Sequence, residues 1–493
     1  MSSTLAISLV GMVLIAGLGF LGRRQPAREL SEWTVGGRRF STATTWFLQA
    51  GESFTTFSFL GLAGLAFGGG VAATYALGYL AMSLIGMYFI GPRTWRLGRD
   101  HGYLTQADFF TDRYRSPLLG KVVALVGAVF LLPYLQLQIT GLGLIVQLAT
   151  GSRNGSHLSM VVATVLTVAF VLWSGIRGIA KVAYLKDILM VVALVVLLIA
   201  VPATLSGGIG HLFHTIQQSH AGLLTIHSGD YDRTWFTTAM LISGIGSGLN
   251  TMPHLWPPVL SARSGRALRS NYVWLPLYQV ALAIPVIIGF VGVLSLSPDT
   301  PGNGVLLTLS HQALPGWVVG VIAVAAAAAA MVPSAAIVMG ISTLVSHNLL
   351  PSRSERARLR TNHLCVVGAS GLALILGIAR PDLLANLLLL TYGGLSQLAP
   401  ATVLALGRRT RLGAVPALLG IVTGVAVLGW LTFGGVDIGT VDAGLIALVP
   451  NIAVSAVAQL LLRRRSGATA DREAPATVHR PADAGAAVGS AAH

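Results

Sequence analysis

The chain has 493 residues, of which 54% are hydrophobic and only 10% are charged. Soluble globular proteins carry about 25% charged residues, so this composition excludes a soluble multidomain enzyme. A single cysteine excludes a disulfide framework and a cysteine-based metal cluster. The 32 Lys and Arg residues against 17 Asp and Glu give a formal net charge of +15, which in a soluble protein would indicate nucleic-acid binding. In a membrane protein the positions of these charges decide their meaning.

Long apolar runs predict thirteen membrane-spanning helices, because a bilayer core of about 30 Å requires roughly 20 apolar residues per helix. A leading span covers residues 4–21 and is followed by arginines, which is typical of a retained anchor and not of a cleaved signal peptide. Ten central spans and two terminal spans follow at 44–69, 71–91, 120–150, 158–175, 184–206, 235–253, 271–296, 316–347, 362–379, 382–406, 413–433 and 440–462.

The basic residues support this topology. With the N-terminus outside and the C-terminus inside, every Lys and Arg except Arg153, Arg233 and Arg380 falls on the inner side. Cytoplasmic loops are enriched in Lys and Arg, so the alternation predicts a multi-pass protein of a bacterial-type cytoplasmic membrane. The charge excess therefore does not indicate nucleic-acid binding.

The spans divide the chain into six segments. These are a leading helix with an inner loop (1–43), a first set of five helices (44–206), an external loop (207–234), a second set of five helices (235–406), two terminal helices (407–465) and a tail (466–493). The Ala, Gly and Pro content of the tail predicts disorder. The external loop holds His211, His214, His220 and His227, whose spacing favours solvated side chains over a metal site.

Two of the central spans contain polar or glycine-rich interruptions. Unsatisfied backbone groups cost several kcal/mol in hydrocarbon, so a broken helix must line a protein-enclosed cavity. The breaks are five spans apart, in helices of opposite direction, which is typical of an inverted-repeat secondary transporter. Close helix packing is the alternative, and it explains Gly61 and Gly64 better than it explains the polar residues. The interruptions comprise Gly51, Glu52, Ser53, Thr55 and Thr56 in the first span, and Gly244, Gly246, Gly248, Asn250, Thr251 and Pro253 in the sixth.

Glu52 is the strongest single candidate for a functional residue. A carboxylate in mid-bilayer costs roughly 2.5–3.5 kcal/mol or more, so it is expected to face a cavity. Burial favours its protonated form, which suits a proton carrier; the alternative is a structural glutamate bonded to the broken backbone. The hydroxyl and amide groups near the breaks are candidate substrate ligands: Ser53, Thr55, Thr56, Gln136, Asn250 and Thr251.

Three further polar positions carry weaker signals. Gln136 in the third span is equally compatible with lining a pocket and with helix–helix hydrogen bonding. Asp187 stands beside Lys186 at the predicted start of the fifth span, where a simple interfacial ion pair is the competing interpretation. His254 is expected to be a cap or interface residue and not a proton relay.

Several stretches of the chain match a known family. The most specific are Trp33-Thr-Val-Gly-Gly-Arg-Arg, Phe59-Leu-Gly-Leu-Ala-Gly64, the inner loop 101–114, Ser174-Gly-Ile-Arg-Gly and the pair Pro253-His254. Over residues 30–460 the chain resembles the sodium:solute symporters, and within them the bacterial monocarboxylate permeases. The resemblance implies an all-α LeuT-type fold of two inverted five-helix repeats. It also implies import of a small organic anion, such as a short monocarboxylate, together with a cation.

The resemblance further implies a sodium site between the first and eighth central spans. Its backbone ligands fall on Gly51, Phe54 and Ala329, and an acidic residue important for cation binding falls on Asp187. Two adjacent hydroxyl ligands are also expected, but they fall on Val332 and Pro333, which have none; Ser334 is the next residue. Sodium needs about five or six oxygen ligands, so H+ competes with Na+ as the expected coupling ion.

Other functions remain open at this point. An uncoupled facilitator or channel on the same scaffold is one alternative, and a symporter for an amino acid or pantothenate is another. No nucleophile, base and orienting group stand together in any span, so we expect neither an enzyme nor a cofactor other than the coupling ion.

Overall fold

The structure, a computed structural model, describes residues 29–150, 156–226, 229–379 and 384–472, together with residues 7, 10, 11, 13–15, 17, 27 and 382. Most of the predicted leading span at 4–21, and the predicted tail beyond Arg472, therefore lie outside the described residues. The described chain is all-helical, with an isolated backbone bridge between Phe40 and Ala262 and no strand.

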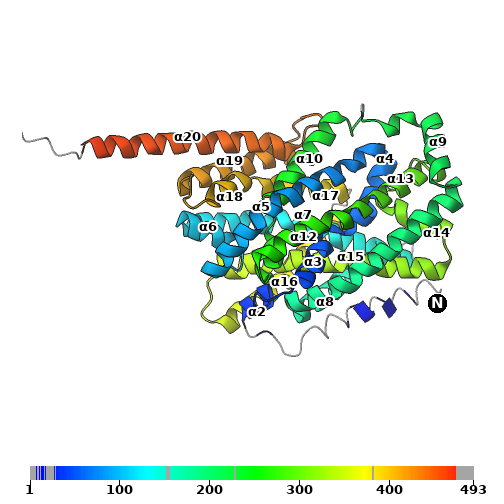
Figure 1. Ribbon diagram of the computed structural model, residues 1–493, viewed down its shortest axis with the longest axis horizontal. Coiled ribbons are helices and arrows are strands. Elements are labelled where there is room, and N and C mark those ends of the chain that lie inside the picture. Colours follow the sequence, from blue (N-terminus) through cyan, green and yellow to red (C-terminus); the bar gives the residue numbers. More distant parts are fainter. Residues whose placement is uncertain are drawn as a thin grey trace, which may run out of the picture.

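The helices follow one another along the whole described chain (Figure 1), and the short 3-10 or π helices between them are named η in the text. The first half contains α2 (Leu30–Val35), α3 (Thr42–Ser53), η1 (Phe57–Gly61), α4 (Leu62–Gly69), η2 (Gly70–Thr74), α5 (Tyr75–His101), α6 (Gln106–Tyr114), α7 (Pro117–Thr150), α8 (Ser156–Ser206), α9 (Ile209–Ser219) and η3 (Ala221–Leu224). The second half contains α10 (Arg233–Gly248), η4 (Pro253–Leu255), α11 (Trp256–Ser261), α12 (Gly265–Gln279), η5 (Val280–Leu282), α13 (Ala283–Ser295), η6 (Gly302–Gly304), α14 (Val305–Ala313), α15 (Gly316–Thr343), η7 (Leu344–Leu349), α16 (Glu355–Ala379), α17 (Leu384–Ser396), α18 (Ala399–Ala405), α19 (Ala414–Phe433) and α20 (Ala443–Arg472).

Most of these helices are membrane-spanning by length and composition. Within the described chain eight helices are long and apolar enough to cross a bilayer, and α17 with α18, which meet at 45°, form a further bent span. The first halves of the two broken spans are too short to be recognised in this way, because α3 has 12 residues and α10 has 16. The total of thirteen spans stays a prediction.

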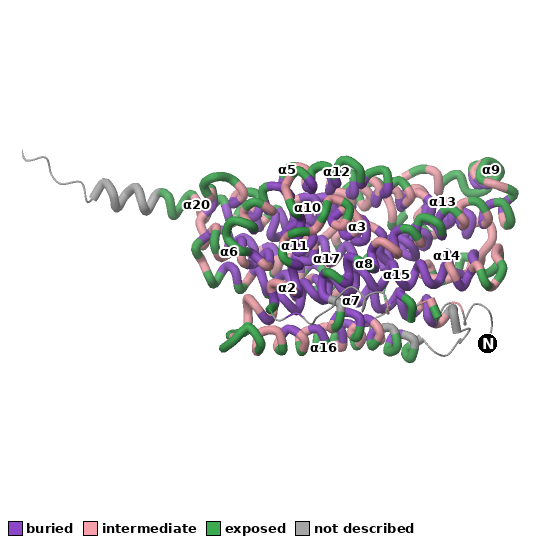
Figure 2. The backbone as a smooth tube through the Cα atoms, turned by 60° about the horizontal axis from the view of Figure 1, so that its bottom comes forward, coloured by how far each residue is buried: buried purple, intermediate pink, exposed green. Residues whose placement is uncertain are grey.

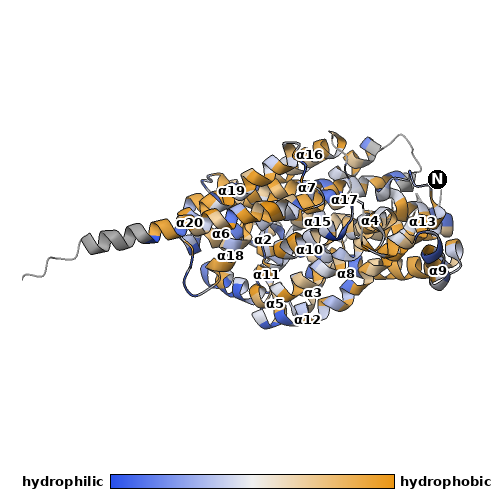
Figure 3. Ribbon diagram, turned by 90° about the horizontal axis from the view of Figure 1, so that it is seen from above, coloured by the Kyte–Doolittle hydropathy of each residue, from blue (hydrophilic) through white to orange (hydrophobic). Residues whose placement is uncertain are grey.

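The helices form one bundle with a buried centre. In Figure 2 the buried residues surround α3, α7, α8 and α15, and α15 is almost entirely buried. Large apolar side chains on α8, α16 and α20 are exposed at the periphery, as expected for surfaces that face lipid. Figure 3 shows the hydrophilic segments mainly toward the ends of the bundle, and α20 extends beyond it (Figure 1). The centre is therefore where a substrate can be held away from lipid.

The predicted break in the first central span is present. Helix α3 ends at Ser53 because Phe54 has an extended backbone (φ −98°, ψ 96°), and the chain resumes as η1 and α4. The sixth span is interrupted after Gly248, where Asn250 has a left-handed φ of 56° before η4 and α11 begin. Both interruptions lie within the buried part of the bundle.

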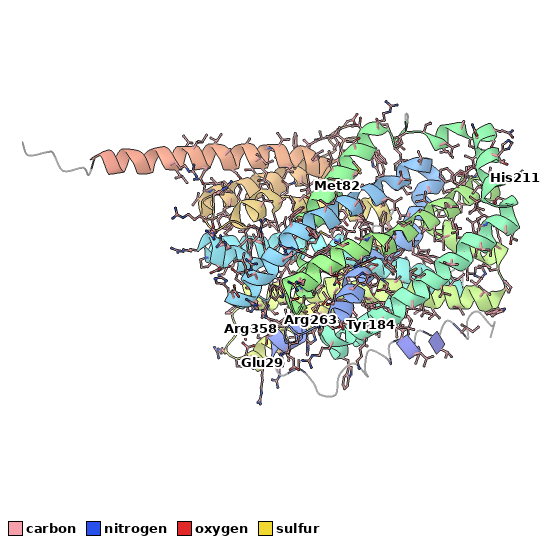
Figure 4. The ribbon with its side chains drawn as sticks, viewed as in Figure 1. Glu29, Met82, Tyr184, His211, Arg263 and Arg358 are labelled. Carbon is pink, nitrogen blue, oxygen red and sulfur yellow. The ribbon has the colours of Figure 1, made fainter. Side chains whose placement is uncertain are left out.

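The glycines of the sixth span do not themselves break the helix, contrary to the expectation from their poor helix propensity. Helix α10 continues through Gly244 and Gly246, because these residues stand where neighbouring helices approach closely. A Cβ on Gly244 would lie 2.9 Å from Cε of Met82 on α5, and a Cβ on Gly246 would lie 2.9 Å from Cδ1 of Tyr392 on α17. Met82 is labelled in Figure 4.

The fourth and fifth predicted spans are joined within α8. Gly175, with a left-handed φ of 51°, interrupts the helix and packs against Trp33, whose Cδ1 would lie 3.0 Å from an added Cβ. The fifth span thus begins at Gly175 and not at residue 184, which corrects the sequence prediction. At 1.5 Å per residue, Lys186 and Asp187 lie roughly 16 Å along this helix. The pair is buried, so the interpretation as an interfacial ion pair is wrong.

The predicted loops occupy the two ends of the bundle. Figure 4 shows Glu29, Arg263 and Arg358 at one end and His211 at the opposite end. His211 belongs to α9, an amphipathic helix within the predicted external loop that buries Leu212 and Ile216. Which end faces the cytoplasm stays a prediction.

Candidate functional site

A cavity of about 80 Å³ lies beside the break in α3. At roughly 30 Å³ per water, it has room for two or three waters or for a solute of a few non-hydrogen atoms. Its walls come from α3, α5, α7, α10, η4, α11, α12 and α17, so both broken spans contribute. The polar residues that line it are Gln49, Glu52, Ser53, Ser83, Tyr134, Ser247, His254, Tyr272, Gln279 and Tyr392.

Glu52 lines this cavity with an unpartnered carboxyl group. Its side chain is 4% exposed, and neither carboxyl oxygen has a hydrogen-bond partner among the described residues. The closest basic group is Nε2 of His254, at 3.8 Å from Oε2. His254 is itself buried, its Nδ1 has no hydrogen-bond partner in the described chain, and its ring packs edge-on against Tyr134. An ionised carboxylate in this position would be costly, whereas the neutral acid has a proton to donate.

Another part of the cavity wall is a hydrogen-bond network between α3 and α12. Gln279 donates to the hydroxyl of Ser53 at 3.1 Å, and Gln49 donates to the hydroxyl of Tyr272 at 2.9 Å. Asn271 donates to Oε1 of Gln49 at 3.1 Å. These bonds hold α3 against α12 and leave Glu52 as the acidic group on the cavity wall.

The six predicted substrate ligands are not all brought together. Ser53 lines the cavity, but the hydroxyl of Thr56 donates to Oε1 of Gln138 at 2.6 Å, and Gln136 donates to the carbonyl of Leu376 on α16 at 3.4 Å. Thr55 is buried at the break and does not line the cavity.

The two predicted ligands of the sixth span stabilise its break. The hydroxyl of Thr251 donates to the carbonyl of Gly246 at 2.7 Å. The carbonyl of Asn250 accepts from Nε1 of Trp256 at 2.9 Å and from Nε2 of Gln106 at 3.3 Å. Both residues therefore hold the broken backbone in place, and neither lines the cavity.

Lys186 stands at the position where the family resemblance implies sodium. Its Nζ donates to the carbonyl of Gly51 at 2.6 Å and lies 3.1 Å from Oδ1 of Asp187. The Lys186 side chain is fully buried, and that of Asp187 is 2% exposed. Oδ1 of Asp187 also accepts the hydroxyl of Tyr278 at 2.9 Å. These contacts join α3, α8 and α12 at the last turn before the break.

The side chains around Gly51 fit a sodium ion poorly. A Cβ on Gly51 would lie 3.4 Å from Cγ1 of Val332 and 3.8 Å from Nζ of Lys186, so a methyl group of α15 faces this position. Pro333 has no hydroxyl, and the hydroxyl of Ser334 donates to a carbonyl one turn earlier in its own helix at 2.6 Å. Too few oxygens converge here for a cation that needs about five or six.

The two remaining predicted cation ligands belong to the same region. Ala329 is buried in α15, and Pro333 lacks the N–H that would bind its carbonyl in a regular helix, so this carbonyl keeps its acceptor capacity. The ring of Phe54 packs against Tyr278 at a centroid distance of 4.6 Å, beside Asp187.

Sequence reasoning missed Lys186 and gave no site role to Tyr278. The missed signal was Gly175 in Ser174-Gly-Ile-Arg-Gly, which has a left-handed φ and interrupts α8. A fifth span that starts at Gly175 places Lys186 well inside the span and not at its first turn. Composition gave a second signal: the sequence has three lysines, and the other two, Lys121 and Lys181, are exposed.

The comparison with known proteins decides the family. The sequence pattern of the sodium:solute symporter family matches residues 33–424. The chain belongs to this family. A symporter of Bacillus subtilis (strain 168), YhjB, itself uncharacterized, is 32% identical over 492 residues, covering 96% of this chain and 100% of the relative. A monocarboxylate transport permease protein of Rhizobium johnstonii is 27% identical, covering 93% of this chain and 97% of the relative.

Solved structures confirm the fold of this sodium:solute symporter family member. A Na+-coupled sialic acid symporter in a substrate-bound outward-open state has a TM-score of 0.78 at 14% identity, covering 94% of this chain and 98% of that chain. Mhp1, a nucleobase-cation-symport-1 family transporter, has a TM-score of 0.57 at 15% identity, covering 87% and 94%. The predicted LeuT-type fold is thereby confirmed, and family and fold are those of multi-pass membrane transporters that couple solute to a cation.

Proposed function

We propose that this protein imports a small organic anion, best matched by a short monocarboxylate, by alternating access coupled to H+. The observation that carries the proposal is the unpartnered carboxyl group of Glu52 on the wall of a cavity of about 80 Å³. The coarser activity, cation-coupled symport, follows from the family.

Electrostatics link the anion to the proton. An ionised Glu52 would repel an anionic solute at short range, whereas the protonated form carries no charge and donates a hydrogen bond to a carboxylate. An anion therefore binds more strongly when Glu52 is protonated, and each partner favours the other. The helices η1 and η4 begin after the breaks, and their N-terminal ends add a positive potential.

Cavity size and similarity favour a short monocarboxylate. A volume of about 80 Å³ accommodates only a few non-hydrogen atoms in this conformation. A relative that aligns with nearly the whole chain is named a monocarboxylate permease. Ser53 is the proposed substrate ligand on the cavity wall. The residues proposed for cation coupling near the same break, besides Glu52, are Gly51, Phe54, Asp187, Ala329 and Ser334.

Uptake into proteoliposomes under separately imposed gradients tests the proposal. Acetate, lactate and pyruvate are expected to accumulate when the outside is more acidic, with no stimulation by a sodium gradient at equal pH. Stimulation by sodium alone would contradict proton coupling. Equilibration without accumulation would indicate an uncoupled facilitator, and preference for pantothenate or an amino acid would refute the monocarboxylate assignment.

A further inference from the structure

We propose that Lys186 is a tethered cation that takes the place of sodium in this transporter. The inference rests on the proposed symport function and concerns how the cation position is filled. It means that solute transport does not require sodium although the chain belongs to a family named for it.

The first observation is the position of the ammonium group. Nζ of Lys186 donates to the Gly51 carbonyl at 2.6 Å, in the last turn of α3 before its break. A hard cation at this position would use the same carbonyl, because backbone oxygens freed by a broken helix are its natural ligands. Lysine thus satisfies the acceptor that sodium would otherwise satisfy.

The second observation is the charge around it. Asp187 lies 3.1 Å from Nζ and also accepts a hydrogen bond from Tyr278, so the ammonium has a fixed counterion. Glu52 is a further ionisable group of this region, and its side chain faces the cavity. The site already contains one cation and one anion, and a sodium ion added beside the buried ammonium would be repelled.

The third observation is the side chain that α15 places beside Gly51. Cγ1 of Val332 would lie 3.4 Å from a Cβ on Gly51, the same Cβ from which Nζ of Lys186 lies 3.8 Å. A hydroxyl at this point would be a sodium ligand, but a methyl group has no affinity for a cation. A methyl group where the family resemblance implies a hydroxyl, and an ammonium, therefore both lie beside Gly51.

A set of four proteins tests this inference: the wild type, Val332→Thr, Lys186→Ala and the double variant Lys186→Ala/Val332→Thr. Threonine has the shape of valine and supplies a hydroxyl, while alanine vacates the ammonium position and leaves the Asp187 carboxylate. Binding of ²²Na+ to each purified protein is measured by scintillation proximity, without substrate. We expect saturable binding by the double variant and none by the wild type or by Val332→Thr.

Transport gives the second measurement. In the absence of sodium, pH-driven accumulation of the solute by Lys186→Ala should be at least tenfold lower than by the wild type. The double variant should regain uptake when sodium is added. Lys121→Met, on the exposed lysine, serves as the control. Lys186→Gln keeps an N–H donor without charge and should show the same loss, which covers the case that the alanine variant does not fold.

Three results would overturn the inference: saturable sodium binding by the wild type, unchanged sodium-free accumulation by folded Lys186→Ala or Lys186→Gln, or absence of sodium binding by the folded double variant. Failure of the proposed function is distinguishable, because it appears as the absence of pH-driven accumulation in the wild type, whereas the sodium-binding measurement needs no substrate.

Discussion

Two consecutive residues of α3 have different neighbours. The carbonyl of Gly51 accepts the Lys186 ammonium, whereas the carboxyl group of Glu52 lines the cavity without a hydrogen-bond partner in the described chain. A movement of this turn would therefore alter the cation position and the solute position together. At the scale of single residues, the coupling between solute and cation is best tested at Glu52.

Replacing Glu52 with glutamine should abolish pH-driven accumulation of the solute. The amide has the shape of the protonated acid and keeps a donor for the anion, but it cannot release a proton. Counterflow exchange, which needs no proton movement, should persist, and both are measured in proteoliposomes. The exposed Glu355→Gln serves as the control. Unchanged accumulation would show that Glu52 has a structural role.

At the scale of helices, backbones approach one another closely through glycine. A Cβ on Gly86 of α5 would lie 2.3 Å from the carbonyl oxygen of Gly248, the last residue of α10. This contact fixes α10 immediately before its break. Helix α6 is fixed differently, by a capping box in which Thr105 and Asp108 bond each other's backbone N–H groups.

The Gly86→Ala variant should be less stable than the wild type. The added methyl group cannot be accommodated without moving α5 from α10, and overpacking of this kind costs about 1–3 kcal/mol. The fall in apparent Tm in detergent measures the effect. Gly368→Ala on α16 is the matched control, because nothing lies within 4 Å of its added Cβ. Equal Tm values for the two variants would refute the close contact.

The Asp108→Asn variant should lose about 1 kcal/mol of stability near neutral pH, because Oδ2 caps α6 by accepting the N–H groups of Leu104 and Thr105 at 2.8 and 3.0 Å. Burial raises the pKa of Asp108, but hydrogen bonds, chiefly from His347, outweigh it and lower the pKa below its ordinary value.

The sign of the pH dependence follows from this lowered pKa. The ionised Asp108 stabilises the folded state above the unfolded pKa of about 3.9, and this stabilisation is lost as the pH falls through the lower folded pKa. The difference in apparent Tm between wild type and Asp108→Asn should therefore be full at pH 7 and shrink below pH 4. A difference that persists undiminished to the lowest pH would exclude this origin.

At the scale of the whole molecule, the two ends of the bundle differ in sequence and in predicted environment. His211 and Arg263 lie at opposite ends (Figure 4). The chain has one cysteine, Cys365, so a Cys365→Ser background allows single cysteines to report sidedness.

In that background, His211→Cys should react with a membrane-impermeant maleimide added to intact cells. Arg263→Cys should react only after the membrane is opened, because the arginine-rich loops are predicted to be cytoplasmic. Labelling is read by gel shift. Reaction of Arg263→Cys in intact cells would invert the predicted topology.

The sequence predicted the architecture better than the site. Apolar runs and the polar cluster around Glu52 indicated the spans and the break in α3, because lipid imposes strong constraints on both. Asn250 and Thr251 were harder to place, since a polar residue at a break can bind a ligand or satisfy the backbone, and only the fold shows which. Lys186 was missed because its depth depends on where the fifth span begins within α8, which is set by the packing of Gly175 against Trp33.

The bond between Lys186 and Gly51 has a consequence for how far the solute can be concentrated. A lysine cannot leave with the solute, so on the proposed mechanism one anion and one proton cross together and their charges cancel. Membrane voltage, about 2.3 kcal/mol per charge per 100 mV, then contributes nothing to uptake. At equilibrium the inside-to-outside ratio of the anion equals the outside-to-inside ratio of protons, about tenfold per pH unit. Accumulation would therefore follow the acidity of the surroundings and be unaffected by depolarisation of the cell.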